Sequence, residues 1–455
     1  MEETTTHTAP AVDLRAERAR CERLVALALE AARAGGADAA EASASVDRGL
    51  SVTVRLGEVE TIEFHRDQGI GIAVYVGRRK ASASTADLRE ASVRAAVEAA
   101  LAIARHTGED ACAGLADPDR LARDWPELDL HHPWGLDAEG AIALARACED
   151  AARAVDRRIE NSEGATVTTH DGTTVYGNTH GFLGGYETSR HSVSCAVVAR
   201  EGEAMERDYW WTVARDPAEL EPAEAVGRRA GERAARRLGG RKLATRECPV
   251  AFAAEVATGL IGHFLGAIRG GRLYRRASFL LDRLGEAVFP AWMAIREDPH
   301  IPKALGSAPF DAEGVATRAR DLVSDGVLRG YVLDTYSACR LGMETTGNAG
   351  GVHNVLVAPS LEGGLESLLA EMGEGLLVTE LMGHGVNYVT GDYSRGAAGY
   401  WVEGGRIAYP VHEITIAGNL ARMFRDIVAV ADDVDRRGRV RTGAILVGRM
   451  TVAGD

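Results

Sequence analysis

The chain has 455 residues, 66 Asp and Glu against 52 Lys and Arg, and a formal net charge of −14. This length predicts two or three domains, and the acidic balance argues against a general nucleic-acid-binding protein, which needs clustered positive charge. No apolar run approaches the roughly 18 residues that a membrane-spanning helix requires, and Met1 to Asp13 carries no signal-like segment. We therefore expect a cytoplasmic protein that binds neither nucleic acid nor membranes.

The six cysteines lie far apart, and no CxxC pair is present. This spacing argues against a disulfide framework and against a cysteine-rich zinc knuckle. Thirteen His and six Cys are still numerous enough to supply a metal site. Their arrangement therefore decides whether one exists.

Helical and strand patterns mix in the first part of the chain. Apolar residues recur at helical spacing over residues 24–31 and 87–106, and they alternate with polar ones over residues 50–56 and 70–76. We expect an N-terminal α+β domain at residues 1–120.

A polar linker at residues 109–136 leads into a second pattern of the same kind. Its predicted elements are a helix at 144–155, two strands meeting in a hairpin turn at Asp171-Gly172, strands at 193–200 and 205–213, and a helix at 222–238. They predict a central α+β domain at residues 121–240.

The remaining sequence is dominated by strand patterns. Runs at 376–381 and 400–409 are split by glycine-rich turns, including Gly404-Gly405, and 411–416 adds another run. One short helix is expected at 420–427. The predicted fold class is therefore α+β: N-terminal α/β modules with antiparallel strands, followed by a β-dominated C-terminal domain at residues 241–455.

Familiar catalytic motifs are incomplete. No Lys follows a Gly, which excludes a P-loop, and no GxSxG elbow is present. His412-Glu413 looks like the beginning of a zinc-protease helix, but Ile416 stands where the second His belongs and the run has a strand pattern. The residues alone therefore indicate no complete catalytic site.

Several polar residues beside glycines are candidates for contact with a substrate or a partner. Asp311 and Glu313 could do acid/base work or bind a cation, or they could belong to a loop closed by Asx-type hydrogen bonds. The other candidates, which could equally be ordinary surface-loop residues, are His353, Asn354, His384, Asn387, Asp392, Ser394 and Arg395.

Long phrases in the C-terminal part resemble the TldD/PmbA family, and most closely its PmbA branch, also called TldE. They include Pro309-Phe310-Asp311-Ala312-Glu313-Gly314, Thr390-Gly391-Asp392-Tyr393-Ser394-Arg395-Gly396 and Glu413-Ile414-Thr415-Ile416-Ala417-Gly418-Asn419. The resemblance continues to the N-terminal part through Arg48-Gly49-Leu50-Ser51-Val52. It covers nearly the whole chain.

The resemblance implies a zinc-dependent peptidase built from a TldD-type and a PmbA-type subunit. In the TldD branch an HExxxH helix and a distant Cys hold the zinc. The corresponding positions here are Ile261, Gly262 and Gly266, with Thr442 near the expected position of the Cys. His263 alone cannot replace them, because catalytic zinc usually has three protein ligands. We therefore expect no catalytic residue and no metal in this chain.

The predicted function is thus that of a PmbA-type subunit that shapes the substrate chamber. Its expected partner is a TldD-type subunit carrying the zinc, with a homodimer also possible, and its expected substrates are peptides such as modified-peptide precursors. Two alternatives remain open: a non-enzymatic peptide-binding or regulatory protein, and a stand-alone hydrolase that uses Asp311, Glu313, His353 and Asp392.

Overall fold

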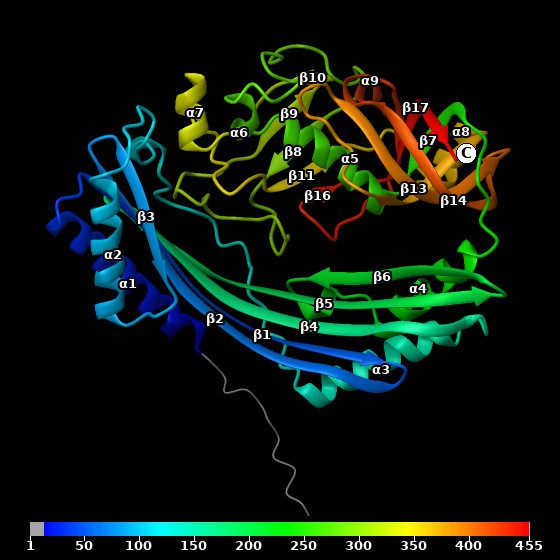
Figure 1. Cartoon of the computed structure of the whole chain (residues 1–455), viewed down its shortest axis with the longest axis horizontal. Helices are drawn as coiled ribbons and strands as arrows, with labels where there is room; N and C mark the ends of the chain where they lie inside the picture. Colours follow the sequence, from blue (N-terminus) through cyan, green and yellow to red (C-terminus); the bar gives the residue numbers. More distant parts are fainter. Residues whose placement is uncertain (1–12, 455) are drawn as a thin grey trace, which may run out of the picture.

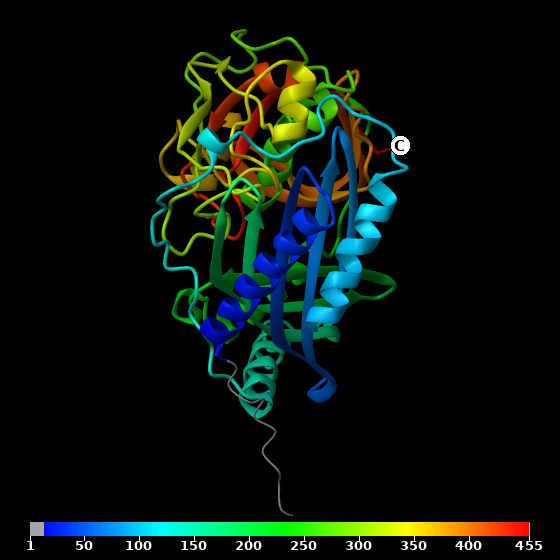
Figure 2. The same ribbon diagram turned by 90° about the vertical axis from the view of Figure 1, so that its left-hand side faces the viewer.

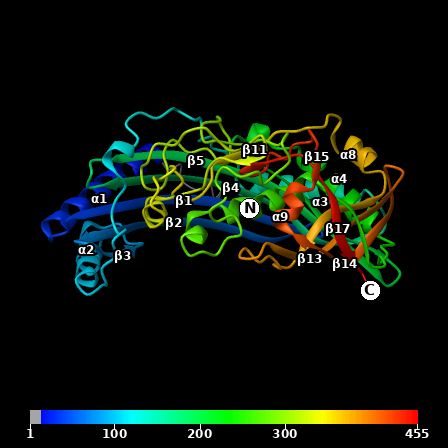
Figure 3. The ribbon, with the colours of Figure 1, turned by 90° about the horizontal axis from the view of Figure 1, so that it is seen from above.

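A long curved sheet carries a second, mostly β domain above its inner side (Figure 1). The computed structural model describes residues 13–454. The stretch Met1 to Asp13, in which the sequence predicts no signal-like segment, lies outside the described residues except for Asp13. Within that range no helix is long and apolar enough to cross a membrane. Seen from above, the second domain lies along the long axis of the sheet (Figure 3).

The curved sheet has six strands in the order β3-β2-β1-β4-β5-β6, and all neighbours are antiparallel. Its strands are β1 (Ala39–Arg55), β2 (Glu58–Val76), β3 (Arg79–Thr85), β4 (Ile159–Asn178), β5 (Leu183–Glu201) and β6 (Ala204–Ala214). Strands from the expected N-terminal and central domains therefore share one sheet. The division at residue 120 stays a prediction.

Four helices pack against one face of this sheet, and their bounds are α1 (Leu14–Ala34), α2 (Glu90–Ala104), α3 (Ala138–Arg153) and α4 (Ala223–Arg237). Helices α1 and α2 lie side by side on one half (Figure 2). Residues at every second position of β1 form this face: Ala40 to Val46 pack under α1 and α2, and Leu50 to Val54 under α3 and α4. Because successive side chains of a strand point to opposite faces, both hydrophobic clusters lie on the same face of the sheet.

The opposite face of β1 is polar. Its residues Ser43, Ser45, Asp47, Ser51 and Thr53 alternate with the buried ones. The Ser51 hydroxyl lies 3.4 Å from that of Thr168, and the Thr53 hydroxyl 3.0 Å from that of Thr166, both on β4. The side of the sheet turned toward the second domain is therefore hydrophilic.

The hairpin expected at Asp171-Gly172 is wrong, because β4 runs through both residues without a turn. Gly172 pairs with Asp47 of β1, and a Cβ on Gly172 would lie 2.1 Å from Asp47 Oδ1. Glycine is needed here for close side-chain approach rather than for a turn. The linker expected at 109–136 contains only the short 3-10 helix η1 (Pro118–Arg120).

The C-terminal domain contains two sheets. The five-stranded one has the order β10-β9-β8-β11-β16, with β8 (Ile295–Asp298), β9 (Arg320–Ser324), β10 (Val327–Leu328), β11 (Asn354–Val357) and β16 (Val440–Arg441). The six-stranded one has the order β14-β13-β12-β7-β17-β15, with β7 (Arg246–Phe252), β12 (Gly375–Met382), β13 (Asp392–Glu403), β14 (Arg406–Asn419), β15 (Ile427–Val430) and β17 (Ile445–Ala453). A further pairing of β14 with β17 makes this sheet curl onto itself.

Helix α5 (Ala254–Ala267) lies in the core between these sheets. Its Leu260, Ile261 and Phe264 are fully or almost fully buried, and Phe264 packs edge-on against Phe289 and Phe424. The short helices are α6 (Gly270–Leu273), α7 (Thr335–Leu341), α8 (Gly364–Met372) and α9 (Leu420–Arg425), together with the 3-10 helix η2 (Pro217–Glu219). The mixed α and β architecture confirms the predicted fold class.

One disulfide forms where the cysteine spacing had argued against a disulfide framework. Cys112 of the linker bonds to Cys339 of α7, although 227 positions separate them in the chain. The Tyr336 hydroxyl also donates to Asp110, at 2.7 Å. Spacing along the chain did not reveal this pair, because only the folding of the linker over the C-terminal domain brings the two sulfur atoms together.

Close contact between α3 and α4 generates a stability prediction. A Cβ on Gly227 of α4 would lie 1.8 Å from the Cys148 carbonyl oxygen of α3. Replacing Gly by Ala gains about 1 kcal/mol of helix propensity, but forcing the helices apart costs more, typically about 1–3 kcal/mol in a packed core and here against backbone. We expect Gly227→Ala to lower the thermal unfolding midpoint. Gly259→Ala in α5, where no described atom lies within 4 Å of the added Cβ, should leave it unchanged or raised.

Candidate functional site

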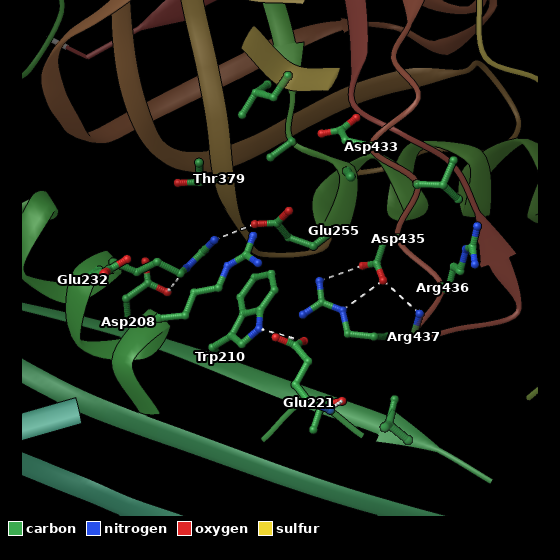
Figure 4. Close-up of a pocket in the computed structure, with 18 of the residues that line it drawn as sticks. Asp208, Trp210, Glu221, Glu232, Glu255, Thr379, Asp433, Asp435, Arg436 and Arg437 are labelled. Atoms are coloured by element: carbon green, nitrogen blue, oxygen red, sulfur yellow. Dashed lines mark hydrogen bonds and ion pairs between the residues drawn. The ribbon is translucent and has the colours of Figure 1, made fainter. Parts of the chain in front are cut away.

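A cavity of about 1180 Å³ lies between the curved sheet and the C-terminal domain (Figure 4). Strand β6 and helix α4 form one wall. The opposite wall comes from the N-terminal end of α5, from β12 to β14 and from residues 433–441. Pockets for small molecules usually measure about 300–1,000 Å³, so this cavity has room for a larger or extended ligand.

A partly buried arginine joins the two walls. Arg233 of α4 pairs through Nε with Asp208 of β6 at 3.1 Å and through Nη1 with Glu255 of α5 at 2.6 Å. Asp208 is only 3% exposed, so its charge depends on such partners, and Arg237 Nη1 lies 3.6 Å from its other oxygen. Because Glu255 stands in the first turn of α5, the ion pair fixes the orientation of that helix against the curved sheet.

A second set of charges joins the same walls one turn further along α4. Arg237 Nε lies 3.2 Å from Glu206 Oε2 of β6, and Arg237 Nη1 pairs with Glu380 of β12. His412 Nδ1 of β14 lies 2.9 Å from Glu206 Oε1. His412 belongs to a strand, as the sequence pattern predicted, and it takes part in an interdomain contact.

Trp210 of β6 lies between two arginine side chains at the wall of the cavity. The guanidinium carbons of Arg229 and Arg437 lie 3.8 and 3.9 Å from its ring centroid. At such distances both must stand over the ring, and they occupy opposite faces because on one face they would overlap. The indole N–H donates to Glu221 at 3.3 Å.

Arg437 uses its remaining donors within the protein. Its Nε and Nη2 each donate to the Asp435 carboxylate at 2.9 Å, and its Nη1 donates to the Trp211 carbonyl at 3.1 Å. The stacked, bidentate arrangement holds residues 435–437 of the C-terminal domain on β6.

Arg215 ties the end of β6 to another loop of the C-terminal domain. It is 8% exposed, and its Nε and Nη2 donate to the carbonyls of Ala304 and Leu305. Burial lowers the pKa of this guanidinium to about 10, so it remains charged at neutral pH. Lys303 in the same loop lies 2.7 Å from Asp216.

The nine residues singled out from the sequence lie elsewhere: none is among the described residues that line the cavity. Asp311 closes a loop, because its Oδ1 accepts from the backbone N–H groups of Glu313 and Val315 and its Oδ2 accepts from that of Ala349. This is the Asx-type arrangement that the sequence left open. Glu313 accepts from the Thr335 N–H at 3.0 Å.

His353 and Asn354 lie in the buried interior of the five-stranded sheet. The His353 Nε2 lies 3.1 Å from the Gly347 carbonyl, and its backbone N–H donates to Glu297. Asn354 donates to the Asp298 carbonyl and the Ser307 hydroxyl and accepts from the Gly306 N–H. The polar atoms of both side chains are thus largely occupied within the protein.

The other five residues lie in the loop between β12 and β13 or at the start of β13. The exposed ones are His384, Asn387, Asp392 and Ser394. The Asn387 side chain accepts hydrogen bonds from the backbone N–H groups of Val389 and Thr390. The Asp392 carboxylate accepts from the Thr390 hydroxyl and the Asn419 amide. Arg395 is half-buried, and its Nε has no partner in the described part of the chain. Contact of all nine residues with a substrate or partner stays a prediction.

His263 of α5 lies next to this loop. Its Nδ1 is 3.1 Å from the Tyr388 hydroxyl, while its buried Nε2 has no partner among residues 13–454. Burial, with the charge of Arg395, lowers the pKa of the imidazole to about 4, so it is neutral at physiological pH. Across the same residues, no group of three or more His, Cys, Asp or Glu side chains is arranged to hold a metal ion.

Sequence reasoning missed the residues that form the cavity, among them Asp208, Trp210, Arg229, Arg233 and Glu255. Two signals were present: an Arg-rich helix and consecutive aromatic residues in a neighbouring strand. Neither pattern shows which residues meet, because α4 and α5 belong to different domains.

The Arg233 contacts lead to a prediction on stability. Arg233→Gln leaves Asp208 and Glu255 without their common partner, and breaking a buried pair in this way costs about 3–5 kcal/mol. We expect the free energy of unfolding to fall by about 3 kcal/mol in denaturant titrations. Arg228→Gln on the exposed side of the same helix should change it by less than about 0.5 kcal/mol. Equal effects of the two substitutions would contradict this account of the cavity.

Glu313 should make stability depend on pH. Burial, with the charges of Asp311 and Asp334, raises the pKa of its carboxyl from 4.5 to about 7. Since the folded state then binds the proton more tightly than the unfolded state, stability is lost as pH rises from about 4.5 to about 7. We expect Glu313→Gln, which removes the titration, to stabilise the protein at pH 8 by up to about 3 kcal/mol relative to its effect at pH 5. Glu98→Gln on exposed α2 should show no such difference between the two pH values.

Comparison with known proteins assigns a family to nearly the whole chain. Residues 40–104, 131–238 and 245–454 match domain 1, the central domain and the C-terminal domain of the PmbA/TldA metallopeptidases. The chain is 50% identical over 442 residues to a Haemophilus influenzae "Metalloprotease PmbA homolog", which covers 97% of this chain and 98% of that protein. It is also 50% identical over 441 residues to "Metalloprotease PmbA" of Escherichia coli O157:H7, covering 96% and 97% of the two chains.

Two solved structures share the fold. A Bacteroides thetaiotaomicron protein, described as a candidate modulator of DNA gyrase, superposes with a TM-score of 0.90 at 27% identity over 95% of this chain and 99% of its own. TldE from Thermococcus kodakarensis gives a TM-score of 0.83 at 22% identity over 96% and 100% of the two chains. Taken with the domain matches, these similarities show that the chain belongs to the PmbA/TldD family of metallopeptidases.

Proposed function

We propose that this chain is the PmbA-type subunit of a cytoplasmic zinc-dependent peptidase, which shapes the substrate chamber while a TldD-type partner supplies the zinc. The observation that carries the proposal is the composition of α5, the helix that the family resemblance aligns with the HExxxH helix. The two relatives that are 50% identical to this chain are named metalloproteases, which supports a role in peptide cleavage.

The residues at the expected ligand positions do not fit a zinc ion. Ile261 is apolar and fully buried in the core, and Gly262 and Gly266 have no side chains to offer. Thr442 is fully buried, and its hydroxyl donates to the Gly443 carbonyl at 3.0 Å. We therefore assign no zinc-dependent step to residues of this chain.

The cavity next to α5 supports a role in holding peptides. Strand β6 forms part of its wall and pairs only with β5 in the described structure. Its outer edge has no strand partner among the described residues, although the Trp211 carbonyl there accepts from Arg437 and the Tyr209 N–H donates to Asp208, so a peptide would have to pair beside these bonds or replace them. An extended peptide can add to such an edge through main-chain hydrogen bonds, which demand little of its side chains. This mode suits a subunit that receives peptides of varied sequence.

Cleavage by the reconstituted pair tests the proposal. We expect the purified chain alone to be inactive toward unfolded peptides, and its addition to the TldD-type subunit of the same organism to raise cleavage at least about tenfold, with loss of activity on chelation of zinc. Equal activity of the partner without this chain would refute the proposal. Stoichiometric zinc and chelator-sensitive turnover in the isolated chain would instead favour a stand-alone hydrolase.

A variant that fills the cavity separates chamber-shaping from mere association. Thr379 of β12 lines the cavity, and Thr379→Trp reduces the space open to a peptide. The variant pair should elute as the wild-type complex does but cleave more slowly. Ile103→Trp, at an exposed position of α2 remote from the cavity, serves as the matched control.

Stable association with another protein and no complex with a TldD-type subunit would favour a regulatory role.

A further inference from the structure

The cavity lining contains seven acidic and seven basic side chains, so its total charge is balanced. What differs among them is whether they are paired. Asp208, Glu255 and Asp435 each pair with an arginine, and Glu221 accepts from the Trp210 indole. Glu219 lies 4.0 Å from Lys303, whereas Glu221, Glu232 and Asp433 have no ion-pair partner within 4.0 Å among the described residues.

Four lining arginines have no carboxylate within 4.0 Å in the part of the chain that the structure describes. They are Arg229 and Arg236 of α4, and Arg436 and Arg441 of the C-terminal domain, and we call them the arginine wall. Arg441 is half-buried, and its Nε is a buried donor without a partner among residues 13–454. Leaving such a donor unsatisfied costs about 1–3 kcal/mol, which an acceptor supplied by a ligand would relieve.

Arg229 is held in a fixed orientation. Although the residue is partly exposed, its guanidinium carbon lies over the Trp210 ring, 3.8 Å from the ring centroid. Stacking occupies the faces of a guanidinium but leaves the in-plane N–H groups free, which match the two oxygens of a carboxylate. Arg437 on the other face of Trp210 shows this geometry, because it stacks and binds Asp435 with two hydrogen bonds.

The electrostatic surroundings point in the same direction. Burial lowers the pKa of Arg229; the charges of Glu221 and Glu255 partly oppose this shift, and those of Arg437 and Arg233 add to it. Burial likewise lowers the pKa of Arg441, with the charge of Arg436 contributing. Both arginines thus have charges of both signs nearby but no carboxylate within 4.0 Å in the described structure, so a ligand carboxylate in direct contact would stabilise their charged forms.

From these observations we infer that the arginine wall is a subsite for a carboxylate group of the peptide, with stacked Arg229 as its preoriented donor. This inference rests on the proposed peptide-holding role and adds a preference to it. The carboxylate could be the C-terminus of the peptide or the side chain of an Asp or Glu, since both present the same planar pair of oxygens.

Binding of three forms of one fluorescent peptide to the full-length chain tests the inference. The peptide consists of Gly, Ala, Ser and Leu residues, and its forms are a free C-terminal acid, a C-terminal amide, and an amide with one internal Glu. Tighter binding of the free acid than of the amide identifies the terminus as the ligand, and tighter binding of the Glu peptide identifies a side chain. Equal binding of all three forms would overturn the inference.

Substitutions assign the effect to the wall. We expect Arg229→Gln and Arg441→Gln each to weaken binding of the preferred acidic form about tenfold, because a hydrogen bond to a charged group contributes roughly 1.5–3 kcal/mol, and to leave binding of the neutral amide unchanged. Arg229→Lys keeps the charge but lacks the planar set of N–H donors, so its affinity for the acidic form should lie between those of the wild type and Arg229→Gln. Arg228→Gln, on the next residue of α4 but outside the cavity, is the matched control. Equal losses for Arg228→Gln and Arg229→Gln would contradict the assignment.

Cleavage of the same three peptides by the reconstituted pair keeps this inference separate from the proposed function. Cleavage of all three forms together with equal binding would refute the carboxylate subsite and leave the subunit role intact. A binding preference without cleavage by the pair would refute the subunit role and leave the subsite intact.

Discussion

The ion pairs of Arg233 are the contacts that join the two halves of the molecule at the cavity. The side of β1 turned toward the C-terminal domain is polar, and the apolar contact between the two halves is a small separate cluster in which Phe182 packs on Phe310. Arg233 instead binds β6 and α5 together through Asp208 and Glu255, and Arg237 repeats the connection to β12. Charged contacts of this kind join the walls while keeping the space beside them open, which is why a cavity persists at this junction.

A fold shared with metallopeptidases need not place the metal in every chain. Here the central helix α5 is used for packing, with Ile261 and Phe264 in the core, and the polar groups gather instead along its first turn at Glu255. In the proposed function, this arrangement would separate the task of holding a substrate, assigned to this chain, from that of activating water, assigned to the partner.

Local patterns predicted most of the fold. Alternation in β1 and β2, the helices α2 and α4, and the strands of the C-terminal domain follow from apolar periodicity, which reports which face of an element is buried. The hairpin expected at Asp171-Gly172 failed because glycine serves there to admit the Asp47 side chain from the neighbouring strand. The Cys112–Cys339 bond escaped notice because 227 positions separate its two halves. Both depend on contacts between distant segments, which no local pattern encodes.

The sequence by itself determined the family, the fold class and the residues at the aligned zinc positions, because these depend on residue identity along the chain. It did not determine the cavity. Trp210, Arg229 and Arg437 come from a strand, a helix and a distant loop, and only the tertiary structure places both arginines on the Trp210 ring. Arg437 is then paired with Asp435, whereas Arg229 has no carboxylate partner within 4.0 Å in the described structure. Whether an arginine has a carboxylate partner is decided by tertiary structure, since the partner lies far away in sequence. For this chain that pairing separates the charges that hold the domains together from those available to a ligand.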